Sequence, residues 1–203
     1  GEFEIGLTFG VMGLGMLAMR PLVGFFADKY GRKHLIIVGA ITIMTTQLLH
    51  VPAAKSGLWT LLLIRFILGL GSSAMYVGQA TTATELPPSD RSGEIFSLFN
   101  VSVVAGFEVG PVVGEITLQK AGFTSAFAVA ALFAFACLIL GILLPETRPP
   151  EAKADFEGLK SLIHPVAVRA GVVSFLLFGA FLSFNAFITP FAESMGVSTV
   201  RWI

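Results

Sequence analysis

Long apolar stretches dominate this sequence and leave few folds open to it. They cover residues 5–26, 35–51, 58–83, 95–118, 125–144 and 171–192, and charged or turn-forming residues separate them. An α-helix rises about 1.5 Å per residue, so roughly 20 apolar residues cross the hydrocarbon core of a bilayer. The stretches are continuously apolar, whereas strands of a membrane barrel alternate between lipid-facing and lumen-facing residues. The sequence therefore predicts an all-α membrane protein, a polytopic bundle of transmembrane helices with about six spans.

The composition excludes most other classes of protein. Hydrophobic residues make up 55% of the chain and charged residues 13%, whereas an ordinary soluble domain carries about 25% charged residues. Lys plus Arg equal Asp plus Glu at 13 each, so no basic excess indicates nucleic acid as a partner. Cys137 is the single cysteine, and neither a phosphate-binding glycine loop nor a nucleophile with its base is recognisable. We therefore expect no enzymatic activity, no metal site and no cofactor.

The basic residues of the connectors indicate how the chain is oriented. The first, third and fifth connectors hold three, one and four Lys or Arg residues, while the second, the fourth and the C-terminal tail hold one each. The positive-inside rule places the odd connectors in the cytoplasm. The N-terminus then lies outside the cell, so we expect a further span upstream of this chain.

The first connector carries the most specific motif of the sequence. It has the form G-x-x-x-D-(R/K)-x-G-(R/K)-(R/K), whose defined positions are Gly24, Asp28, Lys29, Gly31, Arg32 and Lys33. Gly31 supplies the φ freedom for a tight reversal between two spans, and Gly24 permits close approach of another helix. Asp28 lies at a helix C-terminus, whereas Arg32 and Lys33 lie at a helix N-terminus, so each opposes the local helix dipole. Such charges indicate a surface that docks onto another element.

This motif resembles the signature loop between the second and third spans of major facilitator superfamily (MFS) transporters. The resemblance extends over essentially the whole chain and implies a partial MFS fold. Residues 1–144 would form spans two to six of the N-terminal half, 145–168 the cytoplasmic linker between the halves, and 169–203 the seventh span with the start of an outer loop. It also implies that the motif docks onto the C-terminal half, which the remaining spans of a full-length transporter would supply.

The third apolar stretch resembles the fourth span of the family through an R-x-x-x-G-x-G pattern. Its positions are Arg65, Gly69 and Gly71, with Leu68 where a Gln is common. At 3.6 residues per turn, one helix face carries the polar or small residues Arg65, Gly69, Ser72, Tyr76 and Gln79. We predict that Arg65, Tyr76 and Gln79 lie on a pathway for substrate or protons.

The charge of Arg65 leads to a prediction about its partner. A charge near the bilayer centre costs about 2.5–3.5 kcal/mol on insertion scales, so Arg65 should face protein or water and be paired. Glu108 and Glu115 of the following stretch bracket its depth by helix rise. We predict an ion pair between Arg65 and Glu108, which is favoured over Glu115 because the charge of a desolvated acid at its depth needs a cation nearby.

The fourth stretch resembles the antiporter motif of the family, G-x-x-x-G-P-x-x-G-G. The matching positions are Gly106, Gly110, Pro111 and Gly114, while Glu115 replaces the last glycine and Ser97 stands where an upstream glycine is usual. Glycines spaced by four residues predict a smooth face for close helix packing, and Pro111 predicts a hinge. In the last stretch, Asn185 is predicted to line the cavity, since the seventh span does so in this family.

Together these features predict a secondary transporter of a small solute, with proton-coupled export by alternating access as the leading hypothesis. Two alternatives remain. One is an importer of a small organic solute, favoured if Glu115 removes the antiporter character. The other is a membrane scaffold or sensor without transport activity. The expected partners are a small solute, protons, the lipid bilayer and the remaining spans, and the expected location is the plasma (inner) membrane as a multi-pass protein.

Overall fold

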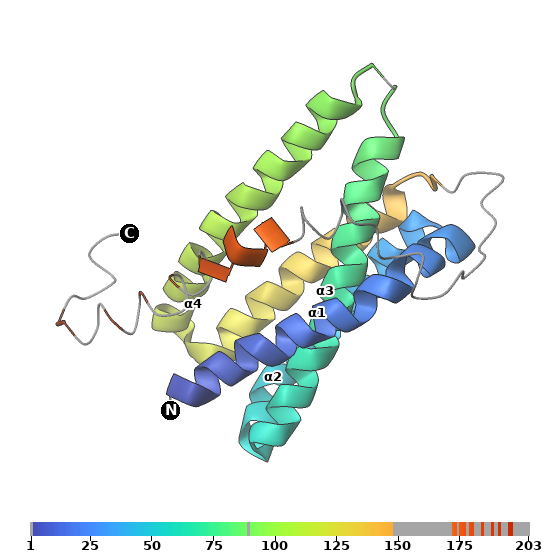
Figure 1. The fold of residues 1–203 in the computed structure, drawn as a ribbon. Coiled ribbons are helices and arrows are strands. Elements are labelled where there is room, and N and C mark those ends of the chain that lie inside the picture. The colour runs from blue at the N-terminus through green and yellow to red at the C-terminus, as the bar shows by residue number, and fades with distance from the viewer. Residues whose placement is uncertain are drawn as a thin grey trace. The chain divides into compact units, whose positions relative to one another are not determined.

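The computed structural model describes residues 2–88 and 90–147, together with positions 172–173, 175–177, 179–180, 184, 188, 191 and 195–196. The chain divides into two compact units, Gly1–Asp155 and Phe156–Ile203. Four helices form the described part of the first unit (Figure 1): α1 Glu2–Tyr30, α2 Arg32–Ser56, α3 Leu58–Glu85 and α4 Ser92–Leu143. Within the described ranges no residue is in a strand.

The helix α4 consists of two consecutive helices rather than one. The backbone of Gly122 is non-helical, with φ 79° and ψ 176°, a conformation that glycine adopts without steric cost. Gly122 lies between the apolar stretches 95–118 and 125–144, so both predicted helices are present. The first five stretches are thus confirmed as helices. Of the stretch 171–192, the described positions are helical, and its other residues, Asn185 among them, lie outside the described part, as do residues 148–168 of the expected linker.

All four described helices are long and apolar enough to cross a membrane, from 25 residues for α2 to 52 for α4. Their ends extend beyond the apolar stretches because the chain continues as helix into polar residues at the connectors, as at Asp28 and Glu85. The prediction of an all-α polytopic bundle is therefore confirmed for the described residues.

Helix α3 packs against both α1 and α2, and glycines make each contact close (Figure 1). A Cβ atom added to Gly69 would collide with the carbonyl oxygen of Met12 in α1. A Cβ atom on Gly71 would lie 2.7 Å from Cβ of Thr42 in α2. The two glycines of the R-x-x-x-G-x-G pattern therefore serve two different helix pairs, and small residues at such contacts let helix backbones approach.

The two parts of α4 differ in how they contact the other helices. The second part lies along α2, where a Cβ atom on Gly141 would be 2.9 Å from Cγ2 of Ile36, and where the rings of His50 and Phe127 stack at 4.8 Å. The first part diverges from α1 and α2 (Figure 1) and meets α3 at the Tyr76–Phe99 ring pair, 6.1 Å apart. Most of its remaining residues are exposed, so this helix leaves a long apolar face open in the described chain.

Candidate gating site and membrane-embedded polar residues

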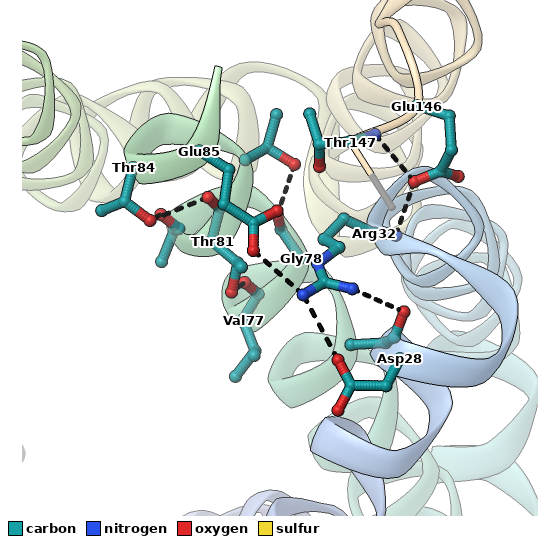
Figure 2. Close-up of polar contacts among 12 residues, drawn as sticks. Asp28, Arg32, Val77, Gly78, Thr81, Thr84, Glu85, Glu146 and Thr147 are labelled. Atoms are coloured by element: carbon teal, nitrogen blue, oxygen red, sulfur yellow. Dashed lines mark hydrogen bonds and ion pairs between the residues drawn. The ribbon is translucent and has the colours of Figure 1, made fainter. Parts of the chain in front are cut away.

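The first, third and fifth connectors meet at one end of the helix bundle around Arg32 (Figure 2). Arg32 is the first residue of α2, Glu85 the last residue of α3, and Glu146 follows the end of α4. These three connectors were assigned to one side of the membrane from their basic residues. Their direct contacts confirm that they lie at the same end.

The guanidinium group of Arg32 is buried and bonded within this half of the fold. Its Nη2 lies 2.9 Å from Oε1 of Glu85 and 3.3 Å from Oδ1 of Asp28, and its Nη1 donates to the carbonyl oxygen of Ala27 at 3.0 Å. A charge at the wrong helix end is unfavourable by itself. The two carboxylates compensate it, and Asp28 in turn gains a cation beside the negative end of α1.

Glu146 caps the start of α2 from outside that helix. The backbone N–H of Arg32 donates to Oε1 of Glu146 at 2.9 Å, and the N–H of Thr147 donates to the same oxygen at 2.9 Å. The cap residue of α2 is Gly31, which has no side chain to bond the free N–H groups of the first turn. A carboxylate at a helix N-terminus is favourable, and Oε2 of Glu146 also lies 3.4 Å from Nδ1 of His34.

Gly31 meets two requirements of this turn. Its φ of 94° lies in the region that favours glycine, which confirms the predicted tight reversal. A Cβ atom at residue 31 would also collide with the carboxylate of Glu146. The same glycine therefore permits both the turn and the cap.

For Arg32 the structure shows partners inside this bundle, and docking of the motif charges onto the C-terminal half stays a prediction. This side chain turns inward because Glu85, at the end of α3, offers a carboxylate inside the same bundle. Lys29 remains exposed, and its Nζ lies 5.5 Å from the ring centre of Phe25 and 5.1 Å from that of Tyr30. Lys33 is half-buried. The close helix approach expected at Gly24 is not made by any described residue, since nothing lies within 4 Å of a Cβ atom there.

Sequence reasoning missed Glu85 and Glu146. Each had a usable signal, because an acid at the edge of an apolar stretch stands close to the basic residues that mark the cytoplasmic side. Glu85 lies two residues after the third stretch, and Glu146 follows the fifth stretch in a Pro-Glu-Thr sequence. Only the fold shows that both carboxylates converge on Arg32.

The predicted ion pair between Arg65 and Glu108 is wrong for the described chain. No carboxylate of the described residues lies within ion-pair distance of Arg65, whose guanidinium carbon lies 6.0 Å from the ring centre of Phe9 in α1. Its Nε is buried without a hydrogen-bond partner there. The reason is the direction of the helix faces: Arg65 is turned toward α1, whereas Glu108 is exposed on the first part of α4.

The two acids of α4 are in different situations. Glu108 forms no hydrogen bond or ion pair with the described residues. Glu115 is half-buried and accepts a hydrogen bond from Nε2 of Gln119 at 2.7 Å, one turn further along the same helix. Helix depth, from which the sequence ranked these two acids, does not give the face on which each lies.

The polar stripe of α3 has mixed surroundings. Tyr76 is exposed beside Phe99, and Gln79 is half-buried. Gly69, between Arg65 and Tyr76, is instead covered by α1. The stripe is therefore continuous on the helix but does not face one common space.

The antiporter-like motif of α4 lies on an open part of the described chain. Nothing lies within 4 Å of a Cβ atom built on Gly106, Gly110 or Gly114. The backbone stays helical through Pro111, and the break of α4 occurs at Gly122. The glycine face thus has no packing partner among the described residues, and the hinge expected at Pro111 is absent from this conformation.

These observations define the class of protein: a polytopic α-helical membrane protein with an ion-paired turn at one end and charged side chains within its spans. The profile of the Major Facilitator Superfamily matches residues 1–203. The chain belongs to this superfamily, and its fold is a part of the MFS fold.

Two curated relatives of the chain are named as drug-resistance proteins. It is 28% identical over 204 residues to the "Multi-drug resistance efflux pump PmrA homolog" of Lactococcus lactis subsp. lactis, covering 98% of this chain and 50% of that protein. It is 29% identical over 187 residues to "Multidrug resistance protein MdtL" of Escherichia coli O157:H7, covering 90% of this chain and 47% of that protein. The chain therefore spans about half the length of the curated relatives it matches.

A solved transporter has the same fold. The chain superposes on a mutant of the peptide transporter POT, crystallised with sulfate, with a TM-score of 0.61 and 20% identity. The superposition covers 98% of this chain and 39% of that one. This likeness concerns the fold alone, and it agrees with the predicted partial MFS fold.

Proposed function

We propose that the full-length protein containing this chain is a secondary transporter of the plasma membrane that exports a small solute in exchange for protons. The observation that carries the proposal is Glu108, an acid in the middle of an apolar helix with no partner among the described residues. Ionisable residues at this depth are costly and mark ion or substrate pathways. The efflux function in the name of the PmrA relative supports export as the direction.

In this proposal Glu108 carries the proton and Arg65 keeps a fixed charge. Glu108 lies sixteen residues after the start of α4 and fourteen residues before its break at Gly122, roughly 24 Å and 21 Å along the helix, so neither end of this helix is within reach of its side chain. In the proposed cycle Glu108 faces the two sides of the membrane in turn, which would let it carry a proton across. The pathway would then be lined by the exposed face of Tyr76 and by Gln79, Glu115 and Asn185.

Alternating access requires that the two halves rock against each other around a site near the midplane. The cluster of Asp28, Arg32, Glu85 and Glu146 would hold the cytoplasmic ends of this half together as one rigid body. Lys29, which stays exposed, would contact the other half. The open face of Gly106, Gly110 and Gly114 would receive a helix of that half. Pro111 would allow α4 to bend during the exchange.

Transport into inverted membrane vesicles tests the proposal. An acidic lumen represents the outside of the cell, so a rhodamine dye should accumulate in vesicles with the full-length protein and leave when the gradient is collapsed. Glu108→Gln should abolish the dependence on the pH gradient, while the matched change at an exposed surface acid, Glu94→Gln, should leave it intact.

The same experiment separates the alternatives. Dye movement out of the acidic lumen would identify an importer, and no movement with any gradient would favour a scaffold or sensor. Because Arg65 and Glu108 are not paired, the effects of Arg65→Leu and Glu108→Gln on transport should combine additively. A strong non-additive coupling would contradict the separation of the two residues.

A further inference from the structure

A buried histidine of α2 has one ring nitrogen without a partner in the described chain. The His50 residue is 2% exposed, and its Nδ1 lies 2.6 Å from the carbonyl oxygen of Thr46, one turn earlier. A carbonyl oxygen can only accept a hydrogen bond, so Nδ1 carries a proton. In the neutral ring Nε2 is then an acceptor. This atom is buried and forms no hydrogen bond with the described residues.

The orientation of the His50 ring is fixed by two contacts. Phe127 of α4 stacks on the ring, with 4.8 Å between the centres and 15° between the planes. The Nδ1 edge is held by the carbonyl oxygen of Thr46 on the same helix. The lone pair of Nε2 is therefore an ordered acceptor, and the ring cannot turn it toward another group without losing both contacts.

Arg65 of α3 offers the complementary group. Its Nε is buried and donates no hydrogen bond to a described residue. Helices α2 and α3 are joined by Gly57 alone, and His50 lies seven residues before this turn while Arg65 lies eight residues after it. Helix rise brings the two residues to nearly the same level, roughly 10 Å and 12 Å from the turn. The contact between Thr42 and Gly71 obeys the same register, and His50 and Arg65 interact electrostatically.

The chemistry of the two nitrogens selects the molecule that fits between them. The Nε–H of Arg65 only donates, and Nε2 of neutral His50 only accepts. They form no bond with each other in the structure. An anion would accept from Arg65 but has no hydrogen to donate to Nε2, and a metal ion would be repelled by the guanidinium charge. A water molecule accepts from one nitrogen and donates to the other.

Water also has access to this end of the helices. His50 lies one residue before the end of the apolar stretch 35–51, so the site is close to the membrane surface although protein covers it. Buried waters in proteins bind polar groups that otherwise have no partner, and they need at least two such groups. The two nitrogens supply this minimum.

We propose that one water molecule bridges the Nε–H of Arg65 to Nε2 of His50 and links the ends of α2 and α3 that meet at Gly57. The partner of Arg65 within this half of the fold is then a water held by a neutral base, not a carboxylate. His50 acts as a positioning residue that orients the guanidinium group through this water. The site does not depend on the proposed transport function.

Nitrogen NMR of the purified full-length protein in lipid bilayers tests the site. Histidine and arginine are isotope-labelled, and the signals of His50 and Arg65 are those that His50→Gln and Arg65→Met remove. At about pH 8, where an ordinary imidazole is neutral, Nδ1 of His50 should carry the proton and Nε2 should not. Both Nε2 of His50 and Nε of Arg65 should receive magnetisation from water protons.

The variant Arg65→Met keeps a long side chain but removes the Nε–H donor. It should weaken the water contact of Nε2 about threefold or more, because the water loses one of its two bonds. The signal of Nε2 should also move toward that of an imidazole nitrogen without a hydrogen bond. Arg91→Met, which removes an exposed arginine, is the matched control and should change neither quantity.

Three results would overturn the proposal. One is a wild-type Nε2 without water contact, which would show a dry site. A second is an Nε2 that carries a proton or accepts directly from Arg65. A third is a water contact of full strength in Arg65→Met, which would show that Arg65 is not the donor. The first two need only the wild-type protein and decide the question even if the variant fails to fold. A bridging water in a protein without gradient-driven transport would contradict the proposed function and leave this inference standing.

Discussion

The burial of the Arg32–Glu85 pair predicts a coupling energy that can be compared with that of a second pair in the same chain. Nη2 of Arg32 lies 2.9 Å from Glu85, with side chains 7% and 30% exposed. Nη2 of Arg91 lies 3.0 Å from Glu94, with side chains 60% and 55% exposed. The residue types and the shortest distances match, although Arg91 binds Glu94 through two hydrogen bonds within one helix turn and Arg32 binds Glu85 through one between two helices. The pairs also differ strongly in their exposure to solvent.

The expected magnitudes follow from the local dielectric. Two unit charges 4 Å apart attract by about 4 kcal/mol at an effective dielectric constant of 20 and by about 1 kcal/mol in water. Desolvation offsets part of this attraction for the buried pair. Asp28 still attracts Arg32 when Glu85 is removed, which lowers the measured coupling further. We expect a coupling energy of about 2 kcal/mol for Arg32–Glu85 and about 0.3–0.5 kcal/mol for Arg91–Glu94.

Double-mutant cycles on the purified full-length protein measure both couplings. The substitutions are Arg32→Gln with Glu85→Gln, and Arg91→Gln with Glu94→Gln, and the readout is the free energy of unfolding in an SDS titration. High salt should remove the coupling of the exposed pair and leave most of that of the buried pair. Equal couplings, or a buried pair that salt abolishes, would refute the conclusion that Arg32 is held inside this half of the fold.

Three further predictions concern packing, topology and the motif. Gly69→Ala should lower the free energy of unfolding by about 1–3 kcal/mol because its Cβ meets the backbone of α1. Gly93→Ala, with open space around residue 93, should be neutral or stabilising. Equal effects of the two substitutions would argue against the α1–α3 contact. A cysteine placed at Ser56 should react with an impermeant thiol reagent from outside the cell and one at Ser92 only from the cytoplasm, and the reverse labelling would invert the orientation. Asp28→Asn in the full-length protein should impair transport while abundance stays near normal, because Glu85 still holds Arg32; unimpaired transport would show that Asp28 is a solvated acid without a role in gating.

Three kinds of local information decided what the sequence could predict. The length and continuity of the apolar stretches gave the helices, because about 20 apolar residues are needed to cross a bilayer whatever their neighbours are. The φ of Gly31 and the break at Gly122 depend on a single residue type, since only glycine adopts those backbone angles without strain. The common side of the odd connectors followed from their basic residues, which respond to the membrane and not to the other helices.

Partner choice was decided by the tertiary structure. The sequence placed Arg65 and Glu108 at similar depth, but a pair also requires that their helix faces point toward each other, and these do not. Arg32 was expected on a surface, yet α3 brings Glu85 to it and the end of α4 brings Glu146. Rotation of a helix about its axis is set by where the neighbouring backbones can approach, as at Gly69 against α1 and Gly71 against α2. Depth and turn geometry are properties of one segment, whereas the face that a charge presents is a property of the packed bundle, and for this reason only the structure decided it.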